Sequence, residues 1–149
     1  MTANETQVGG SHYKSLYEHW DLAVTIPLSY LEGCITKYVT RARKKNGIQD
    51  LKKATHYLEK LIEVSQYPVT RKLDRAEIKV EISRFCVANS LSLLEEEFIL
   101  IMCTHRAVFD LMDAQFLLEE IIEELEIKNK PKVEMNIPGT PEDGGNHAP

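Results

Sequence analysis

The spacing of apolar residues is the feature that most constrains the fold of this chain. Apolar side chains recur at steps of three and four residues through most of the sequence, and glycine and proline cluster near its two ends. This period matches an amphipathic helix, and no stretch shows the alternation that is typical of a strand. We therefore predict an all-α protein with an N-terminal helical hairpin, a third helix, a long C-terminal helix and flexible termini.

The predicted hairpin is defined by its start and stop residues. Pro27 is a favoured first-turn residue, and helically spaced apolar side chains follow it as far as the basic cluster 41–45. Gly47 then supplies a left-handed stop. Asp50 is expected to be the N-cap of a second helix over residues 51–66, so that the two helices form a hairpin with a short turn.

The C-terminal half continues the helical pattern. A third helix is predicted over 73–87, and Ser92 with Glu95 matches a capping box. Residues 96–126 predict one long helix or two nearly collinear helices. Their apolar stripe is wide for a short chain, so we expect part of it to pack on another subunit, which predicts a homo-oligomer through the C-terminal helices.

Composition divides the chain into four parts. Residues 1–10 are polar and are expected to form a flexible arm, and residues 11–66 form a basic helical module. Residues 67–128 are interpreted as a helical extension for oligomerisation. Residues 129–149 hold several prolines and glycines and no aromatic residue, so we expect a disordered tail that cannot bury enough apolar surface to order itself.

The chain has no feature that predicts export or membrane insertion. Its longest apolar run, 98–103, is far shorter than the roughly 18 residues of a membrane span, and its polar start lacks a signal-peptide core. Cys34, Cys86 and Cys103 are odd in number and widely spaced, which fits neither a disulfide framework nor a zinc motif. Each is interpreted as a small core residue in a reducing compartment, so we expect a cytoplasmic protein of one domain.

Charge is unevenly distributed along the chain. Residues 37–60 contain eight basic and two acidic side chains, although the whole protein has a net charge of −5. Residues 63–149 contain seventeen acidic and nine basic side chains. Segregation on this scale predicts an anionic partner for the first half.

The basic segment predicts a phosphate-binding cleft. Gly33, Lys37, Arg41 and Lys44 recur at helical spacing and share one face, and Gly33 leaves room for a ligand to approach the backbone. Antiparallel packing of the hairpin would bring this face toward a second set on the next helix, which consists of Asp50, Lys53 and Tyr57. Arginine and lysine are suited to phosphate oxygens, and phosphoryl transfer depends mainly on positioning and charge neutralisation. The sequence contains no glycine-rich P-loop motif.

Several of these residues occur in an order that resembles a known family. Residues 9–13 read Gly-Gly-Ser-His-Tyr, Trp20-Asp21 follows, and residues 33–58 contain Gly-x-x-x-Lys-Tyr-x-x-Arg and Asp-Leu-x-Lys-Ala-x-x-Tyr-Leu. Over roughly residues 10–62 this pattern is similar to a bacteriophage family known as SaV-like proteins of unknown function, which includes a phage nucleotide kinase without a P-loop. The resemblance implies transfer of a phosphoryl group to a nucleoside monophosphate, in the host cytoplasm if the chain is phage-encoded.

The resemblance also implies roles for individual residues. Lys37 and Arg41 would hold phosphates and stabilise transition-state charge, and His12 or Asp50 would orient the acceptor. The substrate-binding set would be Tyr13, Gly33, Tyr38, Lys45, Lys53 and Tyr57. A nucleotide would be the phosphate donor, Mg²⁺ is left open, and no metal ligand is assigned. The chain departs from the family at Cys34, where the family has asparagine, and His19, His56 and His105 are assigned only surface or core-edge positions.

Three alternative functions remain open at this stage. The same cations would serve a non-catalytic phage protein that binds or sequesters a host nucleotide or a defence signalling molecule. An all-helical pyrophosphohydrolase would need paired acidic helices for Mg²⁺, and only residues 119–124 suggest half of such a set. Nucleic-acid binding by the basic cluster is disfavoured, because the acidic C-terminal half opposes a broad contact surface.

Overall fold

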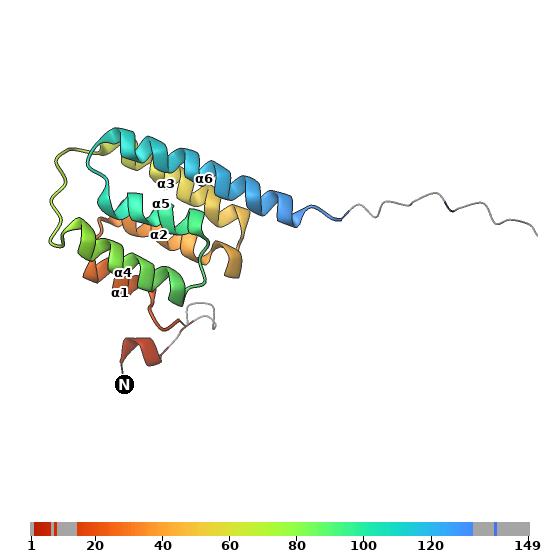
Figure 1. The fold of residues 1–149 in the computed structure, drawn as a ribbon, viewed down its shortest axis with the longest axis horizontal. Helices are drawn as coiled ribbons and strands as arrows, with labels where there is room; N and C mark the ends of the chain where they lie inside the picture. The colour runs from red at the N-terminus through yellow and green to blue at the C-terminus, as the bar shows by residue number, and fades with distance from the viewer. Residues whose placement is uncertain (1, 7, 9–14, 133–138, 140–149) are drawn as a thin grey trace, which may run out of the picture.

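The computed structural model describes residues 2–6, 8, 15–132 and 139, and every regular element among them is helical. Consecutive α-helices such as α5 and α6 run antiparallel, and the helices enclose one core (Figure 1). Two 3-10 turns accompany them. The elements in chain order are η1 (Ala3–Glu5), α1 (His19–Thr25), α2 (Tyr30–Arg41), η3 (Ala42–Lys44), α3 (Ile48–Val64), α4 (Arg75–Ala88), α5 (Leu93–Thr104) and α6 (Val108–Asn129).

Four of these helices form a bundle. α2 packs against α3, α3 against α6, α6 against α5, and α5 against α2 (Figure 1). α4 covers the outer side of α5, and α1 lies against α4 and α2. A single hydrophobic core includes Ile35 and Leu58 from the hairpin together with Phe98 and Leu118 from the C-terminal half, all of them buried. The basic module and the helical extension therefore share one core.

The α2–α3 hairpin follows the sequence pattern, with different ends. α2 begins after Ser29 rather than at Pro27, because the Ser29 hydroxyl accepts a hydrogen bond from the Glu32 backbone N–H at 3.3 Å. Gly47 has the positive φ expected of it, +54°, but with ψ −127° it lies outside the αL region and serves as the N-cap of α3. The prediction of Asp50 as an N-cap is wrong. α3 begins at Ile48 with Gly47 as its N-cap, and the Asp50 carboxylate pairs with a side chain instead.

The predicted long helix over 96–126 is also corrected. α5 and α6 are not collinear, since they lie side by side and run in opposite directions (Figure 1). The chain leaves the helix at His105, whose backbone is extended. Asp110 stabilises the new helix start, because its Oδ2 accepts hydrogen bonds from the backbone N–H groups of Arg106 at 2.6 Å and Ala107 at 3.0 Å. The apolar spacing continues through this break and conceals it.

A buried polar cluster fixes the same turn to the hairpin. Glu32 accepts hydrogen bonds at Oε1 from Arg71 Nη2 at 2.6 Å and lies 2.7 Å from Nε2 of His105. Tyr67 Oη lies 2.8 Å from the other ring nitrogen of that histidine. Burial raises the pKa of Glu32, but the bonds from His105 and Arg71 outweigh it and lower that pKa to about 2. His105 is therefore a buried partner of Glu32 and not a core-edge residue.

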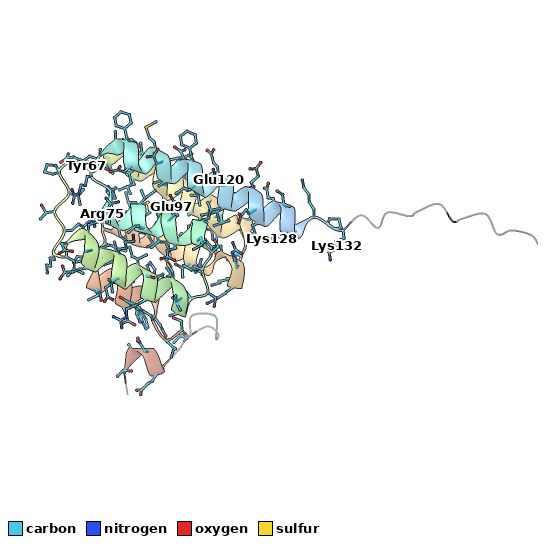
Figure 2. The ribbon with its side chains drawn as sticks, viewed as in Figure 1. Tyr67, Arg75, Glu97, Glu120, Lys128 and Lys132 are labelled. Atoms are coloured by element: carbon cyan, nitrogen blue, oxygen red, sulfur yellow. The ribbon has the colours of Figure 1, made fainter. Side chains whose placement is uncertain are left out.

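The outer faces of the bundle are polar with local exceptions. The side chains of Glu120 and Lys128 point outward from α6 (Figure 2). On the same helix Phe109, Met112 and Phe116 are 71%, 42% and 63% exposed. No helix in the described ranges combines the length and the apolar character needed to cross a membrane.

Candidate functional site

A pocket of about 350 Å³ lies between α1, α2 and the N-terminal residues. Three cations from the end of α2 and the following turn form one wall, and two ring side chains of α1 form another. The N-terminal segment contributes Thr6 and Val8 to the lining, and it is attached to α1 because Asn4 Oδ1 accepts a hydrogen bond from Trp20 Nε1 at 2.7 Å. The described residues that line it are Thr6, Val8, Glu18, His19, Trp20, Lys37, Thr40, Arg41, Lys44 and Asn89.

The basic wall follows directly from helical spacing. Lys37, Arg41 and Lys44 are four and three residues apart, so their side chains leave the same face. Lys37 and Lys44 are exposed, while Arg41 is half-buried. The one acidic side chain on the described pocket wall is Glu18, which is nearly buried at the N-cap of α1. The wall therefore carries a positive charge that favours an anion.

Arg41 is held in place by a carboxylate below the pocket. Its Nε donates to Asp50 Oδ2 at 3.0 Å and its Nη2 donates to Oδ1 at 3.1 Å, which is a two-point ion pair. Asp50 is fully buried, and Lys53 Nζ lies 3.9 Å from its Oδ1. The Arg41 guanidinium also lies over the Tyr38 ring at 4.7 Å. Asp50 thus orients Arg41 and neutralises part of its charge, and it does not line the pocket.

A second group of side chains lies next to Arg41 and consists of the predicted Tyr38, Lys53 and Tyr57 together with Tyr30. The rings of Tyr38 and Tyr57 stack at 5.7 Å with an angle of 24° between them, and Tyr30 meets Tyr57 edge-on at 6.4 Å. Lys53 Nζ lies 5.6 Å from the Tyr38 ring centre. We call Tyr30, Tyr38, Lys53 and Tyr57 the tyrosine face. Hydrogen bonding to Tyr57 raises the pKa of Tyr30 to about 12, and burial raises that of Tyr38.

The predicted cleft between the two hairpin helices stays a prediction, and its residues fall into two neighbouring groups that meet at Arg41. Lys37 and Arg41 line the pocket, whereas Lys53 and Tyr57 belong to the tyrosine face and not to the pocket wall. α2 and α3 pack closely, and the pocket takes further lining residues from α1. The short length of α1 gave no periodic signal in the sequence.

The remaining predicted residues lie in different places. Lys45 is exposed in the turn after α2, and its neighbour Lys44 reaches the pocket instead. A Cβ added at Gly33 would have no atom within 4 Å, so the space beside it is open. His12 and Tyr13 lie outside the described residues. Cys34 is half-buried and is not a core residue, unlike Cys86 and Cys103.

His19 lines the pocket, although the sequence analysis assigned it only a surface or core-edge position. Its Nε2 lies 2.8 Å from Thr36 Oγ1, and its ring meets Phe85 edge-on at 6.2 Å. Burial, followed by the charge of Lys37, lowers the pKa of His19 to about 4. This imidazole is therefore neutral at physiological pH. Its position next to Trp20, in a segment with several ring side chains, was the only available sequence signal.

The acidic residues that the structure describes do not form an evident metal site. Among the residues that the structure describes, no three His, Cys, Asp or Glu side chains are close enough together to hold a metal ion. Glu119, Glu120 and Glu123 lie along an open groove on α6, which is remote in sequence from the basic wall. Glu124 approaches Arg43 at 4.0 Å.

The fold and the pocket define a helical-bundle protein with a cationic pocket beside its N-terminal hairpin. Residues 9–59 are similar to a family described as a protein of unknown function, DUF3310. This region contains α1, α2 and most of α3, and it supplies most of the pocket wall, with Thr6, Val8 and Asn89 outside it. No curated protein and no solved structure matches the chain.

Proposed function

We propose that this protein binds a nucleotide in the pocket between α1 and α2, with its phosphate at Lys37, Arg41 and Lys44. The observation that supports the proposal most directly is the common face of these three cations on a pocket wall with a single acidic residue. Arginine can hold two phosphate oxygens at once, and lysine adds a compact charge that can turn toward a third. Trp20 and His19 on the opposite wall offer surfaces for a nucleoside.

The size of the pocket bears on whether the protein also transfers phosphate. Ligand pockets range from about 300 to 1,000 Å³, so a pocket of about 350 Å³ is suited to one small ligand. A kinase must hold a donor and an acceptor together. For phosphoryl transfer to a nucleoside monophosphate, the second nucleotide would bind outside this pocket, and the tyrosine face adjoins it through Arg41.

Binding without turnover is the second candidate, and the small volume of the cationic pocket favours it. Such a protein would sequester a nucleotide or a nucleotide-derived signal. The two candidates differ in a direct experiment: incubation with a radiolabelled nucleoside triphosphate and an unlabelled monophosphate. A new labelled product would support transfer, whereas stoichiometric retention of unchanged nucleotide would support sequestration.

The proposed binding is tested by calorimetry with a matched pair of lysine variants. Lys44 and Lys52 are both exposed, but only Lys44 lines the pocket. A hydrogen bond to a charged group contributes about 1.5–3 kcal/mol, so Lys44→Ala should weaken nucleotide binding by at least roughly tenfold. Lys52→Ala should leave the affinity unchanged. Equal affinities for both variants and the wild type would contradict the proposed phosphate position.

Self-association through α6 stays a prediction. The exposed side chains of Phe109, Met112 and Phe116 follow one side of the helix, and a second copy could cover them in a symmetric contact. The described residues contain no feature that fixes the number of subunits.

A further inference from the structure

The hydrogen bonds around His19 define which of its ring nitrogens carries the proton. The Thr36 hydroxyl has one hydrogen, and it donates that hydrogen to the Glu32 backbone carbonyl at 2.9 Å. With the hydroxyl hydrogen on that carbonyl, we assign Thr36 Oγ1 as the acceptor of the hydrogen bond from His19 Nε2 at 2.8 Å. Because this imidazole is neutral, a protonated Nε2 leaves Nδ1 as a lone-pair acceptor.

The acceptor nitrogen has no partner among the residues described. None of them hydrogen-bonds to His19 Nδ1. A buried side-chain nitrogen without a partner occurs among the described residues at Arg71 and not at His19, so Nδ1 is not fully buried. It is therefore accessible. Nε2 is engaged with Thr36 of α2, and His19 lines the pocket, so Nδ1 is the ring nitrogen left for a ligand there.

We infer that His19 sets the orientation of a nucleotide bound in this pocket, because its Nδ1 accepts a hydrogen bond from a sugar hydroxyl or a base N–H group of the nucleotide. This inference rests on the proposed function. An ionised phosphate offers oxygens and few hydrogens, so it is repelled by the Nδ1 lone pair and attracted to Lys37, Arg41 and Lys44. The nucleoside half carries the N–H and O–H donors that this acceptor requires.

Trp20 supports the same orientation. Its indole N–H donates to Asn4 Oδ1, and Asn4 Nδ2 donates to Asp21 Oδ2 at 2.9 Å. Asn4 therefore holds the Trp20 ring and is itself held by Asp21. The ring lines the pocket and is 47% exposed. A fixed aromatic ring next to a hydrogen-bond acceptor is suited to a base, which has a flat face and polar edges. The pocket lining therefore offers cations for a phosphate and, beside them, a ring and an acceptor for a nucleoside.

This arrangement predicts a preference for nucleoside phosphates over phosphate compounds without a nucleoside. Pyrophosphate can use the cations but has no group for Trp20 or for His19 Nδ1. We expect wild-type protein to bind at least one common ribo- or deoxyribonucleoside monophosphate roughly tenfold or more tightly than pyrophosphate. Fluorescence of Trp20, the single tryptophan of the chain, reports the binding of either probe.

Two substitutions separate the acceptor from the packing of the ring. In His19→Gln the amide nitrogen can still reach Thr36, but the Nδ1 acceptor is lost. In His19→Asn an amide oxygen lies near the former position of Nδ1. We expect His19→Gln to lose roughly five- to tenfold in monophosphate affinity with pyrophosphate affinity unchanged, while His19→Asn retains most of the preference.

The outcomes distinguish this inference from the proposed function. Unchanged preference for the monophosphate in His19→Gln, with wild-type circular dichroism, would overturn the role of His19 and leave the phosphate site intact. An equal loss of affinity for the monophosphate and for pyrophosphate in both variants would also overturn it, because that result indicates only a disturbed pocket. Failure of the wild type to bind any nucleotide, or an unaffected Lys44→Ala variant, would instead contradict the proposed function.

Discussion

The ion pair between Arg41 and Asp50 gives the strongest single prediction of stability. Asp50 is fully buried, and Arg41 supplies two hydrogen bonds to it at 3.0 and 3.1 Å. Removing one partner of a buried pair costs about 3–5 kcal/mol, because the remaining charge has lost its compensation. Lys53 lies 3.9 Å from the carboxylate and offsets part of the loss, so we expect about 3 kcal/mol for Arg41→Ala.

This loss should be measurable by urea denaturation followed by circular dichroism. For a chain of this length it corresponds to a fall of about 6–12 °C in Tm. Lys52→Ala serves as the control and should remain within about 0.5 kcal/mol of the wild type. Replacing both partners, as in Arg41→Met with Asp50→Leu, should restore most of the stability, since no unpaired charge remains.

The reasoning is refuted if Arg41→Ala unfolds at the same urea concentration as the Lys52→Ala control. Such a result would mean that water or another cation satisfies Asp50 without Arg41. The prediction also affects how binding data are read. Loss of nucleotide binding in Arg41→Ala would combine a missing phosphate contact with a weakened fold, so Lys44 is the cleaner probe of the pocket.

Further predictions concern pH, the open space at Gly33 and the outer face of α6. The folded-state pKa of Glu32 is about 2, below its ordinary value of 4.5. Its contribution of about 3 kcal/mol to folding stability is therefore present above pH 4.5 and is lost as pH falls toward 2. Glu32→Gln should flatten this part of the stability–pH curve, and a curve identical to wild type would contradict the role of the cluster. Gly33→Ala should stabilise α2 by about 0.5–1 kcal/mol in thermal melts, because a helical glycine is entropically costly and a Cβ there meets no atom within 4 Å. A loss of stability would show that the space beside Gly33 does not accommodate the added methyl group. Phe116→Ser should reduce self-association in sedimentation experiments if α6 is a subunit interface, and a wild-type protein that stays monomeric at all concentrations would refute that interface.

Local patterns predicted the helices that carry strong signals. The all-α class is confirmed, and the α2–α3 hairpin follows from apolar spacing and from the positive φ of Gly47. α1 was missed because a helix over 19–25 is too short to show a period. The break between α5 and α6 was missed because apolar residues continue at helical spacing across His105, which turns inward to meet Glu32.

The site was harder to predict than the fold, since its parts come from distant segments. Helical spacing placed Lys37, Arg41 and Lys44 together, and the structure brings these three to one pocket wall. Nothing local indicated that Asp50 is buried beneath Arg41, because a charged residue in a first helical turn is usually a solvated cap. The opposite wall depends on tertiary contacts of α1 with α2 and of Asn4 with Trp20. Such contacts leave no periodic trace in the sequence.

The most direct test of the account is a crystal structure of the protein with the nucleoside monophosphate that binds most tightly. We predict that its phosphate lies within hydrogen-bond distance of Lys37, Arg41 and Lys44, with the nucleoside toward His19 and Trp20. A nucleotide bound on the tyrosine face with the pocket left empty, or a phosphate directed toward His19 with the nucleoside near Lys44, would contradict the account.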